Sequence, residues 1–183
     1  MEVRRTPLDG VLVLKPAVHI DTRGFFMESY SARTLQSLGI DVHFVQDNHS
    51  RSMKGVLRGL HYQVNPGQVK LVRAISGAIF DVAVDIRHGS PTFGRWFGQV
   101  LSEDNFLQLY MPPGFAHGFC VLSERADIAY KVNTFYSPPD ERGLRWDDPE
   151  IGIDWPVSDP LVSERDRHHP GLADIKAEFV YQP

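Results

Sequence analysis

Short runs in which apolar and polar residues alternate, each closed by turn-forming residues, recur along almost the whole chain of 183 residues. Alternation with a period of two predicts half-buried β-strands. The expected strands cover residues 11–14, 24–30, 43–50, 55–64, 69–75, 78–86, 93–101, 105–111, 115–122 and 128–135. Helical signals are confined to residues 31–38 and to a short turn or helix that begins at Ser163. Many short strands without a strand–helix rhythm indicate an all-β antiparallel sandwich or barrel of jelly-roll type, with short peripheral helices.

The chain shows no linker, internal repeat or low-complexity segment. We therefore expect residues 1–183 to form a single jelly-roll domain. A tail rich in proline and charge, from about residue 138, is expected to wrap over the barrel. Ser76 and Gly77 separate two of the alternating runs, and this junction predicts a tight hairpin.

Composition limits the partners and the compartment. Hydrophobic residues make up 42% and charged residues 23% of the chain, as in an ordinary globular protein. The net charge of −4 argues against a broad nucleic-acid surface. The apolar run at residues 11–14 is too short to cross a bilayer, and no secretion signal is visible. A single cysteine, Cys120, excludes an internal disulfide and indicates a reducing setting. We expect a cytoplasmic protein with no nucleic-acid or membrane partner.

The run at residues 78–86 places two carboxylates on one strand face. In a regular strand, Asp81 and Asp85 point away from the apolar side chains of Val82 and Val84. A lone buried charge is costly, so we expect these aspartates to meet solvent or a cation.

Metal binding is one possible function, because jelly-roll barrels often hold a metal on clustered histidines. None of the eight histidines forms the His-x-His pair that places two ligands on one strand face. His61 is followed two positions later by Gln63, and glutamine is a poor ligand for a catalytic transition metal. His168 and His169 are adjacent, so a strand would point them in opposite directions. We therefore expect no metal.

Covalent and nucleotide-cofactor chemistry also lack their usual signatures. Cys120 lies in an apolar run without an adjacent cation, so we expect a small core residue rather than a nucleophile. The chain has no Gly-x-Ser-x-Gly elbow, no phosphate-binding loop of the Walker type and no Gly-x-Gly-x-x-Gly motif after a strand.

A histidine and a lysine on consecutive predicted strands form the most informative chemical signal. The segment Gly55-Val-Leu-Arg-Gly-Leu-His-Tyr-Gln63 contains His61, and Lys70 begins the next strand after a Pro-Gly turn. This pairing supplies a possible proton acceptor and a possible fixed positive charge, which acid–base chemistry beside an oxyanion requires. Tyr130 and Tyr136 have the same strand parity, so a regular strand would aim both phenols at one face. Each such residue alone is more often structural, and only their joint placement would make a site.

Arg58 and His61 have opposite parity on a regular strand. Both can face one pocket only if the backbone bends between them. Gly59 is the natural place for such a bend, so we expect a β-bulge there.

Ordered motifs along most of the chain resemble one known family. They are Asp21-Thr-Arg-Gly-Phe25, Gln46-Asp-Asn-His-Ser50, Gly55 to Gln63, Lys70-Leu-Val-Arg73, Pro112-Pro-Gly-Phe-Ala-His-Gly-Phe119 and Leu161-Val-Ser-Glu-Arg-Asp166. Over roughly residues 7–166 the chain resembles the dTDP-4-dehydrorhamnose 3,5-epimerases, the cofactor-free epimerases of the deoxysugar pathway to rhamnose. The resemblance implies a cupin-type jelly roll, usually a homodimer, in which N-terminal strands contribute to the partner's sheet. It implies no cofactor.

The resemblance also implies a substrate and a set of roles. The substrate is dTDP-4-dehydro-6-deoxy-D-glucose, inverted at C3 and C5 through enolates to dTDP-4-dehydro-L-rhamnose. His61 is the implied proton acceptor, oriented and charge-balanced by Asp166. Tyr130 is the implied proton donor on the opposite sugar face, and Lys70 steadies the oxygen that becomes anionic. The implied substrate-contacting residues are Arg23, Glu28, Gln46, Asp47, Asn48, Arg58, His117, Glu141 and Arg165, together with Tyr136, which would stack on the thymine ring.

Two departures from the family pattern are visible. Asn133 stands where threonine is frequent, and Arg165 stands where lysine is common. Arginine keeps the charge but changes the geometry of a phosphate contact. Neither departure removes a catalytic group. Three other functions stay open at this point: a mono-epimerase acting at C3 or C5 alone, a non-catalytic cupin that binds a nucleotide sugar, and a metal-dependent cupin enzyme.

Overall fold

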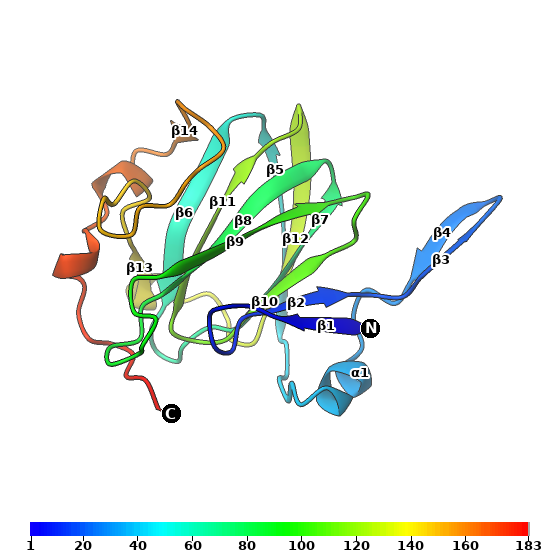
Figure 1. The fold of residues 1–183 in the computed structure, drawn as a ribbon, viewed down its shortest axis with the longest axis horizontal. Coiled ribbons are helices and arrows are strands. Elements are labelled where there is room, and N and C mark those ends of the chain that lie inside the picture. The colour runs from blue at the N-terminus through cyan, green and yellow to red at the C-terminus, as the bar shows by residue number, and fades with distance from the viewer. Residues whose placement is uncertain (183) are drawn as a thin grey trace.

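Two antiparallel sheets face each other in the computed structural model, which describes residues 1–182 (Figure 1). The first sheet has the order β1-β2-β10-β7-β12-β5, and the second has the order β13-β6-β11-β8-β9 with β14 parallel to β6. The first comprises β1 (Glu2–Arg5), β2 (Leu12–Lys15), β5 (Gln46–Met53), β7 (Lys70–Ser76), β10 (Gln108–Met111) and β12 (Arg125–Val132). The second comprises β6 (Val56–Gln63), β8 (Ala78–Asp85), β9 (Trp96–Ser102), β11 (Phe115–Val121), β13 (Glu141–Gly143) and β14 (Leu161–Val162). The prediction of an all-β antiparallel jelly roll is confirmed.

Helical structure is sparse and peripheral, as predicted. The one α-helix of the described residues is α1 (Ala32–Ser37), where Ser31 accepts a hydrogen bond from the Thr34 N–H and so caps the first turn. Three short 3₁₀ turns follow in the C-terminal part, at Pro138–Asp140, Asp166–His168 and Leu172–Asp174. No helix within residues 1–182 has both the length and the apolar composition needed to cross a membrane.

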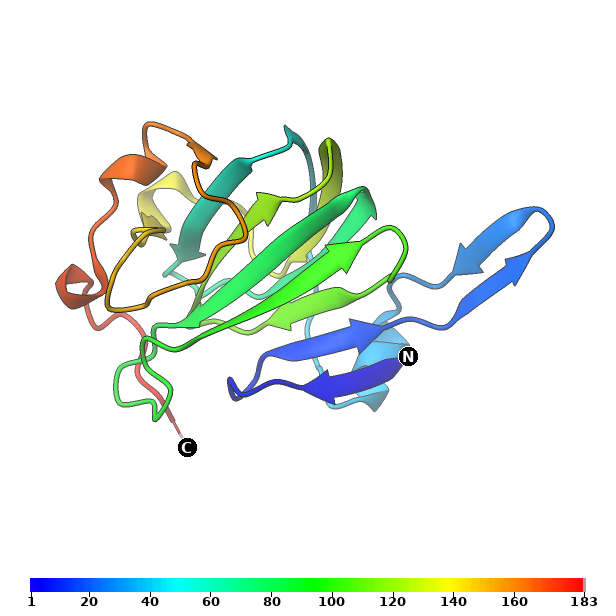
Figure 2. The ribbon, with the colours of Figure 1, turned by 45° about the horizontal axis from the view of Figure 1, so that its top comes forward.

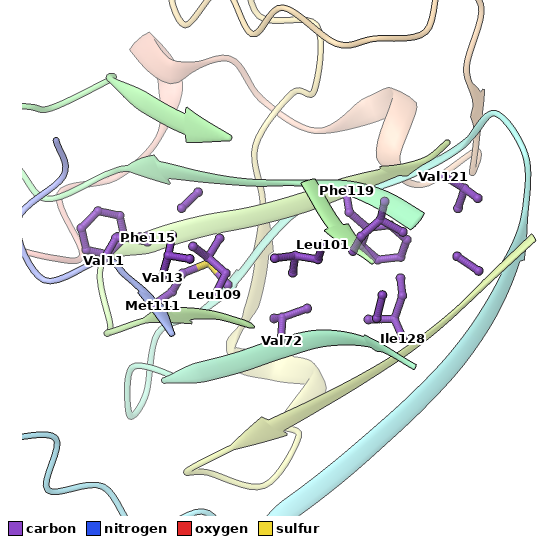
Figure 3. Close-up of a cluster of buried hydrophobic side chains, with 14 of the residues drawn as sticks. Val11, Val13, Val72, Leu101, Leu109, Met111, Phe115, Phe119, Val121 and Ile128 are labelled. Carbon is purple, nitrogen blue, oxygen red and sulfur yellow. The ribbon is translucent and has the colours of Figure 1, made fainter. Parts of the chain in front are cut away.

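The main core fills the space between the two sheets. Figure 3 shows Val72 and Ile128 of the first sheet facing Leu101 and Phe119 of the second. Val72 and Leu101 are completely removed from water. Burial of each such side chain contributes about 1.5–3 kcal/mol, so this layer is a main source of stability for the sandwich.

The C-terminal segment covers the outer face of the second sheet. Leu60 on β6 and Val84 on β8 point outward, and they pack against Leu144 and Leu172 from that segment. Buried Cys120 packs in a neighbouring outer cluster, and burial raises its pKa to about 11. The prediction that this cysteine is a core residue is confirmed.

The junction at Ser76 and Gly77 is not a hairpin, so that prediction was wrong. β7 belongs to the first sheet and β8 to the second, and the chain crosses from one to the other at Gly77. Its φ of +71° and the backbone oxygen of Arg125, which a Cβ would approach to 2.2 Å, both require glycine here. An alternating pattern identifies a strand, but it does not identify the strand's partner.

Several strand boundaries differ from the predicted ones by up to three residues, and in β5 and β12 both ends are displaced. β5 and β12 pair in antiparallel register from Gln46 opposite Val132 to Met53 opposite Arg125. The strand predicted at 128–135 therefore begins and ends three residues earlier, and the strand predicted at 43–50 begins and ends three residues later. The register is determined by pairing with β7 and not by the apolar pattern alone. The exposed strand β1 carries no apolar alternation and was missed.

A hairpin of β3 (Val18–Asp21) and β4 (Gly24–Met27) projects from the body, on the side away from β13 and β14 (Figures 1 and 2). Its apolar side chains Ile20, Phe25 and Phe26 are exposed.

Candidate active site

A β-bulge in β6 brings Arg58 and His61 to the same interior face. In the pairing with β11, His61 lies opposite His117 and Arg58 lies opposite Phe119, so β6 holds one extra residue between the two pairs. The extra residue lies between Arg58 and His61, in the stretch that contains Gly59, whose φ is +129°. The bulge predicted at this glycine is confirmed.

The bulge also explains why glycine is needed on both strands. A Cβ on Gly59 would approach the Gly118 Cα to 2.5 Å, so the two backbones are in contact. Leu57 and Leu60 on either side of the bulge pack outward, and Arg58 reaches across the sandwich to donate from Nε to the Ser52 Oγ at 3.0 Å. The local backbone thus converts residues of opposite parity into neighbours.

His61 is held by a carboxylate from the C-terminal segment. The distance from His61 Nε2 to Asp166 Oδ1 is 2.7 Å, and the Gly59 N–H donates to Asp166 Oδ2 at 3.2 Å. Asp166 enters at the edge of β6 between the stretches that pair with β13 and β14. Burial by itself would raise the pKa of Asp166, but the hydrogen bond and charge of His61 and the Gly59 N–H lower it to about 2. An ionised carboxylate therefore faces Nε2, and Nδ1 is left as the ring nitrogen that can accept a proton.

Lys70 places a cation next to this pair. Its Nζ donates to the backbone oxygen of His61 at 3.2 Å, and the side chain is almost wholly buried. Burial lowers the pKa of Lys70 to about 8, an effect opposed by the charges of Asp81 and Glu141. The ammonium is thus kept charged at neutral pH in a water-poor position.

A second imidazole–carboxylate pair lies on the neighbouring strands. His117 Nε2 lies 2.8 Å from Asp81 Oδ1, and both side chains are buried. Burial lowers the pKa of His117, although Asp81 counteracts this effect. The expectation of a paired carboxylate is confirmed for Asp81, and also for Asp85, which accepts hydrogen bonds from Arg87 and Ser90.

The two tyrosines differ in their placement. Tyr130 lies on β12 and packs against the core between the sheets, and burial raises its pKa despite the opposing charge of Arg58. β12 ends at Val132, so Tyr136 lies in the following loop and is half exposed. The parity argument assumed that one strand carries both tyrosines. It applies to Tyr130 on β12, but not to Tyr136, which lies beyond the end of that strand. Tyr136 instead donates from Oη to Glu141 Oε2 at 2.7 Å.

The polar rim of the site is tied together by hydrogen bonds. Arg165 Nη2 lies 2.6 Å from Glu141 Oε1, and the Tyr136 N–H donates to Gln46 Oε1 at 3.2 Å. Gln46 in turn donates to Asn48 Oδ1 at 2.8 Å. A cleft of about 510 Å³ opens here, lined by Val56, Leu57, Arg58, His61, Glu141, Leu161, Val162, Ser163, Arg165 and Asp166. A cleft of this volume can hold a small organic ligand.

Five of the residues implied by the resemblance line this cleft, namely Arg58, His61, Glu141, Arg165 and Asp166. Three of the others make contacts elsewhere in the single chain. Arg23 lies at the tip of the projecting hairpin, with its side chain exposed and bound to Asp21. Glu28 accepts a hydrogen bond from Thr34 of α1. Asp47 pairs with Lys131 on the outer face of the first sheet at 2.8 Å.

Sequence reasoning missed His169. Its Nε2 lies 3.4 Å from Asp166 Oδ1, three residues away along a 3₁₀ turn. Residues at i and i+3 of a 3₁₀ helix lie above one another, so the spacing in Asp166-Arg-His-His169 could have indicated the contact. The ligand atoms of His61, Asp166 and His169 lie within 4.8 Å of one another, a spacing that a divalent cation could bridge. In this structure, His61 Nε2 and Asp166 Oδ1 are already joined to each other by a hydrogen bond.

One of the two departures from the family pattern has a structural role. Asn133 Oδ1 accepts a hydrogen bond from the Val69 N–H at 2.7 Å. This contact anchors the backbone immediately before Lys70, so the asparagine supports the position of the cation.

Comparison with known proteins gives a consistent result. The family model described as dTDP-4-dehydrorhamnose 3,5-epimerase matches residues 5–174. A dTDP-4-dehydrorhamnose 3,5-epimerase of Shigella flexneri is 56% identical over 168 residues, which is 91% of this chain and 93% of that protein. A dTDP-4-dehydrorhamnose 3-epimerase of Streptomyces niveus is 39% identical over 178 residues, covering 96% of this chain and 86% of its own length.

The fold comparison agrees. The crystal structure of a dTDP-6-deoxy-D-glucose-3,5-epimerase from Legionella pneumophila Philadelphia 1, in complex with dTDP-4-keto-L-rhamnose, superposes with a TM-score of 0.96. It is 48% identical in sequence, and the match covers 100% of this chain and 99% of that one. The jelly roll is therefore of the cupin type found in these epimerases. The chain belongs to the dTDP-4-dehydrorhamnose 3,5-epimerase family.

Proposed function

We propose that this protein inverts C3 and C5 of dTDP-4-dehydro-6-deoxy-D-glucose to give dTDP-4-dehydro-L-rhamnose. The observation that carries the proposal is the His61–Asp166 pair beside the buried ammonium of Lys70. Together these groups supply a base of fixed orientation and a positive charge where an enolate oxygen would form.

The first step is proton abstraction next to the ketone. The 4-keto group acidifies the hydrogens on C3 and C5, and Nδ1 of His61 accepts one of them. Asp166 keeps the Nε2–H in place and stabilises the imidazolium that forms. The carbonyl π bond becomes an enolate whose negative charge on O4 is stabilised by Lys70 in a site with little water.

Inversion then requires a proton from the other face of the sugar. Tyr130 stands on β12 of the first sheet, whereas His61 stands on β6 of the second, so the two groups approach the interior from facing walls. The phenol is a weak acid, and burial raises its pKa further, but an enolate carbon is a strong enough base to take its proton. The enolate returns to the ketone, and the stereocentre is inverted.

The nucleotide would bind at the polar rim. Arg58 and Arg165 provide guanidinium groups suited to diphosphate oxygens. Arg165 is held by Glu141 and Tyr136 is held by the same carboxylate, so diphosphate binding would exchange one anion for another at Arg165. Stacking of thymine on the half-exposed ring of Tyr136 would position the sugar through a part of the substrate remote from the reaction.

We also propose that the protein acts as a homodimer whose projecting hairpins reach into the partner. The exposed Phe25 and Phe26 would be covered in that assembly, and Arg23 and Glu28 would complete the partner's cleft. Sedimentation of the wild type and of Phe26→Asp tests this. A dimer that dissociates in the variant supports the arrangement, whereas a wild-type monomer with full activity contradicts it.

The proposed location is the cytoplasm. The supporting observation is the free thiol of Cys120, which is buried and has no disulfide partner among residues 1–182. Fractionation of cells that produce the protein would test this, and recovery outside the cytoplasm would contradict it.

Solvent exchange tests the reaction itself. Incubation with dTDP-4-dehydro-6-deoxy-D-glucose in heavy water should place deuterium at both C3 and C5 of the product. Deuterium at one carbon only would select the runner-up, a mono-epimerase, a candidate favoured by the similarity to the 3-epimerase of Streptomyces niveus. Tight binding of the nucleotide sugar without deuterium at either carbon would indicate a binding protein instead.

A further inference from the structure

A second imidazole lies against the carboxylate that holds the base. His169 packs edge to face with His61, with ring centroids 5.7 Å apart and planes at 81°. Its Nε2 is buried and has no well-formed hydrogen bond within the described part of the chain, and the nearest acceptor is Asp166 Oδ1 at 3.4 Å. Unpaired buried polar atoms are rare because each costs free energy, so this one calls for an explanation.

The space for this ring is provided by one glycine. Gly143 of β13 lies directly opposite His61 in the strand pairing. A Cβ at this position would lie 2.1 Å from His169 Nε2 and 2.2 Å from its Cε1. The imidazole therefore occupies the volume that any side chain at residue 143 would need. The glycine thus leaves room for His169 beside His61 and Asp166.

We propose that His169 is a positioning residue that acts on His61 through Asp166 and reduces the basicity of the catalytic imidazole. This inference rests on the proposed function for its catalytic consequence but not for its geometry. Both imidazoles face Asp166 Oδ1, His61 Nε2 at 2.7 Å and His169 Nε2 at 3.4 Å. A slight approach of a neutral His169 with a proton on Nε2 would divide this oxygen between two donors and hold the carboxylate in one orientation. A third donor, the Gly59 N–H, holds Asp166 Oδ2.

The electrostatic setting agrees with a neutral His169. Burial lowers the pKa of His169, and the charges of His61 and Arg165 act in the same direction, against Asp166. The charged and titratable groups around the ring come from several elements. They are His61 and Tyr62 on β6, Glu141 and Arg142 on β13, Arg165 and Asp166 on its own segment, and Asp174, Lys176 and Glu178 across an adjoining cleft. These influences favour the neutral imidazole of His169, which can donate a hydrogen bond but carries no charge.

Removal of His169 has a predictable sign. In His169→Leu, Asp166 is left to His61 alone. The N–H group of His169, whose dipole has its positive end near His61, is also lost. Both changes favour the protonated form of His61. The pH at which its ring signals titrate by NMR in the resting enzyme should rise by about one unit, the usual spread between protein environments. His169→Gln keeps an N–H donor and should shift the titration less.

Catalysis provides a second readout. In His169→Leu the acid limb of the profile of kcat/KM against pH should move up with the NMR titration. We expect kcat to fall about tenfold with KM unchanged, a smaller effect than the 10²- to 10⁴-fold typical of losing the base itself. The matched control is His168→Leu, since His168 is an exposed imidazole that bonds to the Glu164 carbonyl. It should change neither measurement.

A second route to the same state uses Gly143→Ala, which would push the ring of His169 away from Asp166 without removing it. Alone, this substitution should raise the pH of the His61 NMR titration as His169→Leu does. Combined with His169→Leu, it should cause no further rise. Imidazole added to His169→Ala should restore activity, because the adjoining cleft of about 480 Å³ leads to the vacated position.

The outcomes separate this inference from the proposed function. A raised His61 titration without epimerase activity would support the positioning role and reject the function. An unchanged or lowered titration in folded His169→Leu, or in Gly143→Ala if the first variant does not fold, would overturn the positioning role whatever the activity.

Discussion

His61 and Asp166 are 105 positions apart in the chain, yet the Nε2 of one lies 2.7 Å from the Oδ1 of the other. The contact exists because the C-terminal segment returns to the edge of β6, where Leu161 and Val162 pair with Val56 and Leu57. The Asp166 N–H donates to the Ser163 Oγ, which fixes the turn that presents the carboxylate. Orientation of the base thus depends on how the last part of the chain packs on the sheet.

Replacement of Asp166 by asparagine should lower kcat by about 10²- to 10⁴-fold, the range typical of general-base catalysis. The amide N–H₂ would face Nε2 and favour the tautomer with a proton on Nδ1, so the base would be blocked. Steady-state kinetics check this, with Asp147→Asn as the control because Asp147 pairs with Arg145 at the surface. Near-normal kcat in Asp166→Asn would show that the carboxylate does not orient His61.

The activity should fall as the pH rises through about 8, because Lys70 has a pKa of about 8 and must be charged to stabilise the enolate. The alkaline limb of the kcat/KM profile measures this. In Lys70→Arg the guanidinium stays charged, so the limb should move to higher pH even where the rate is reduced. A limb that stays at the same pH in this variant belongs to another group.

Lys70 should also be a destabilising residue at neutral pH. Its pKa of about 8 lies below the ordinary 10.5, so the unfolded chain binds more protons between these values and the free energy of unfolding rises with pH across them. Lys70→Met should therefore be inactive and more stable than the wild type at pH 7, and it should lose that rise. Denaturant titrations at pH 7 and pH 9 check this. Lys54→Met, which removes an exposed lysine, should leave the stability almost unchanged.

Gly59→Ala should destabilise the protein by about 2–6 kcal/mol, the combined cost of a strained backbone and an overpacked contact. The new Cβ would meet the Gly118 Cα at 2.5 Å. Gly55→Ala separates the two effects, because Gly55 has a φ of +78° but open space around it. Its cost should be only about 1–2 kcal/mol. Equal losses in the two variants, measured by chemical denaturation, would mean that the contact with Gly118 is unimportant.

Tyr130→Phe should separate proton removal from inversion. His61 can still abstract a proton and return a solvent-derived one from its own face, so deuterium should enter at one carbon while net inversion is strongly slowed. Product analysis by NMR in heavy water checks both. Inversion at the normal rate in this variant would assign the proton donor to another group.

Much of the site could be predicted because local patterns carry it. His61 and Lys70 stand on strands whose alternation is clear, and the bulge at Gly59 followed from a conflict of parity between Arg58 and His61. The orientation of Tyr136 could not be obtained in this way, since β12 ends at Val132 and the loop beyond has its own geometry. His169 was missed because a strand rule was applied to residues that lie in a 3₁₀ turn.

The amino-acid sequence by itself determined the all-β class, the strand identities and the chemical character of the site, because periodicity and residue type are local properties. Only the tertiary structure decided which strands pair, that the chain changes sheet at Gly77, and that Asp166 and His169 meet beside His61. These are contacts between residues far apart in the chain or packed across elements. They depend on the simultaneous burial of several apolar faces, which no single segment specifies.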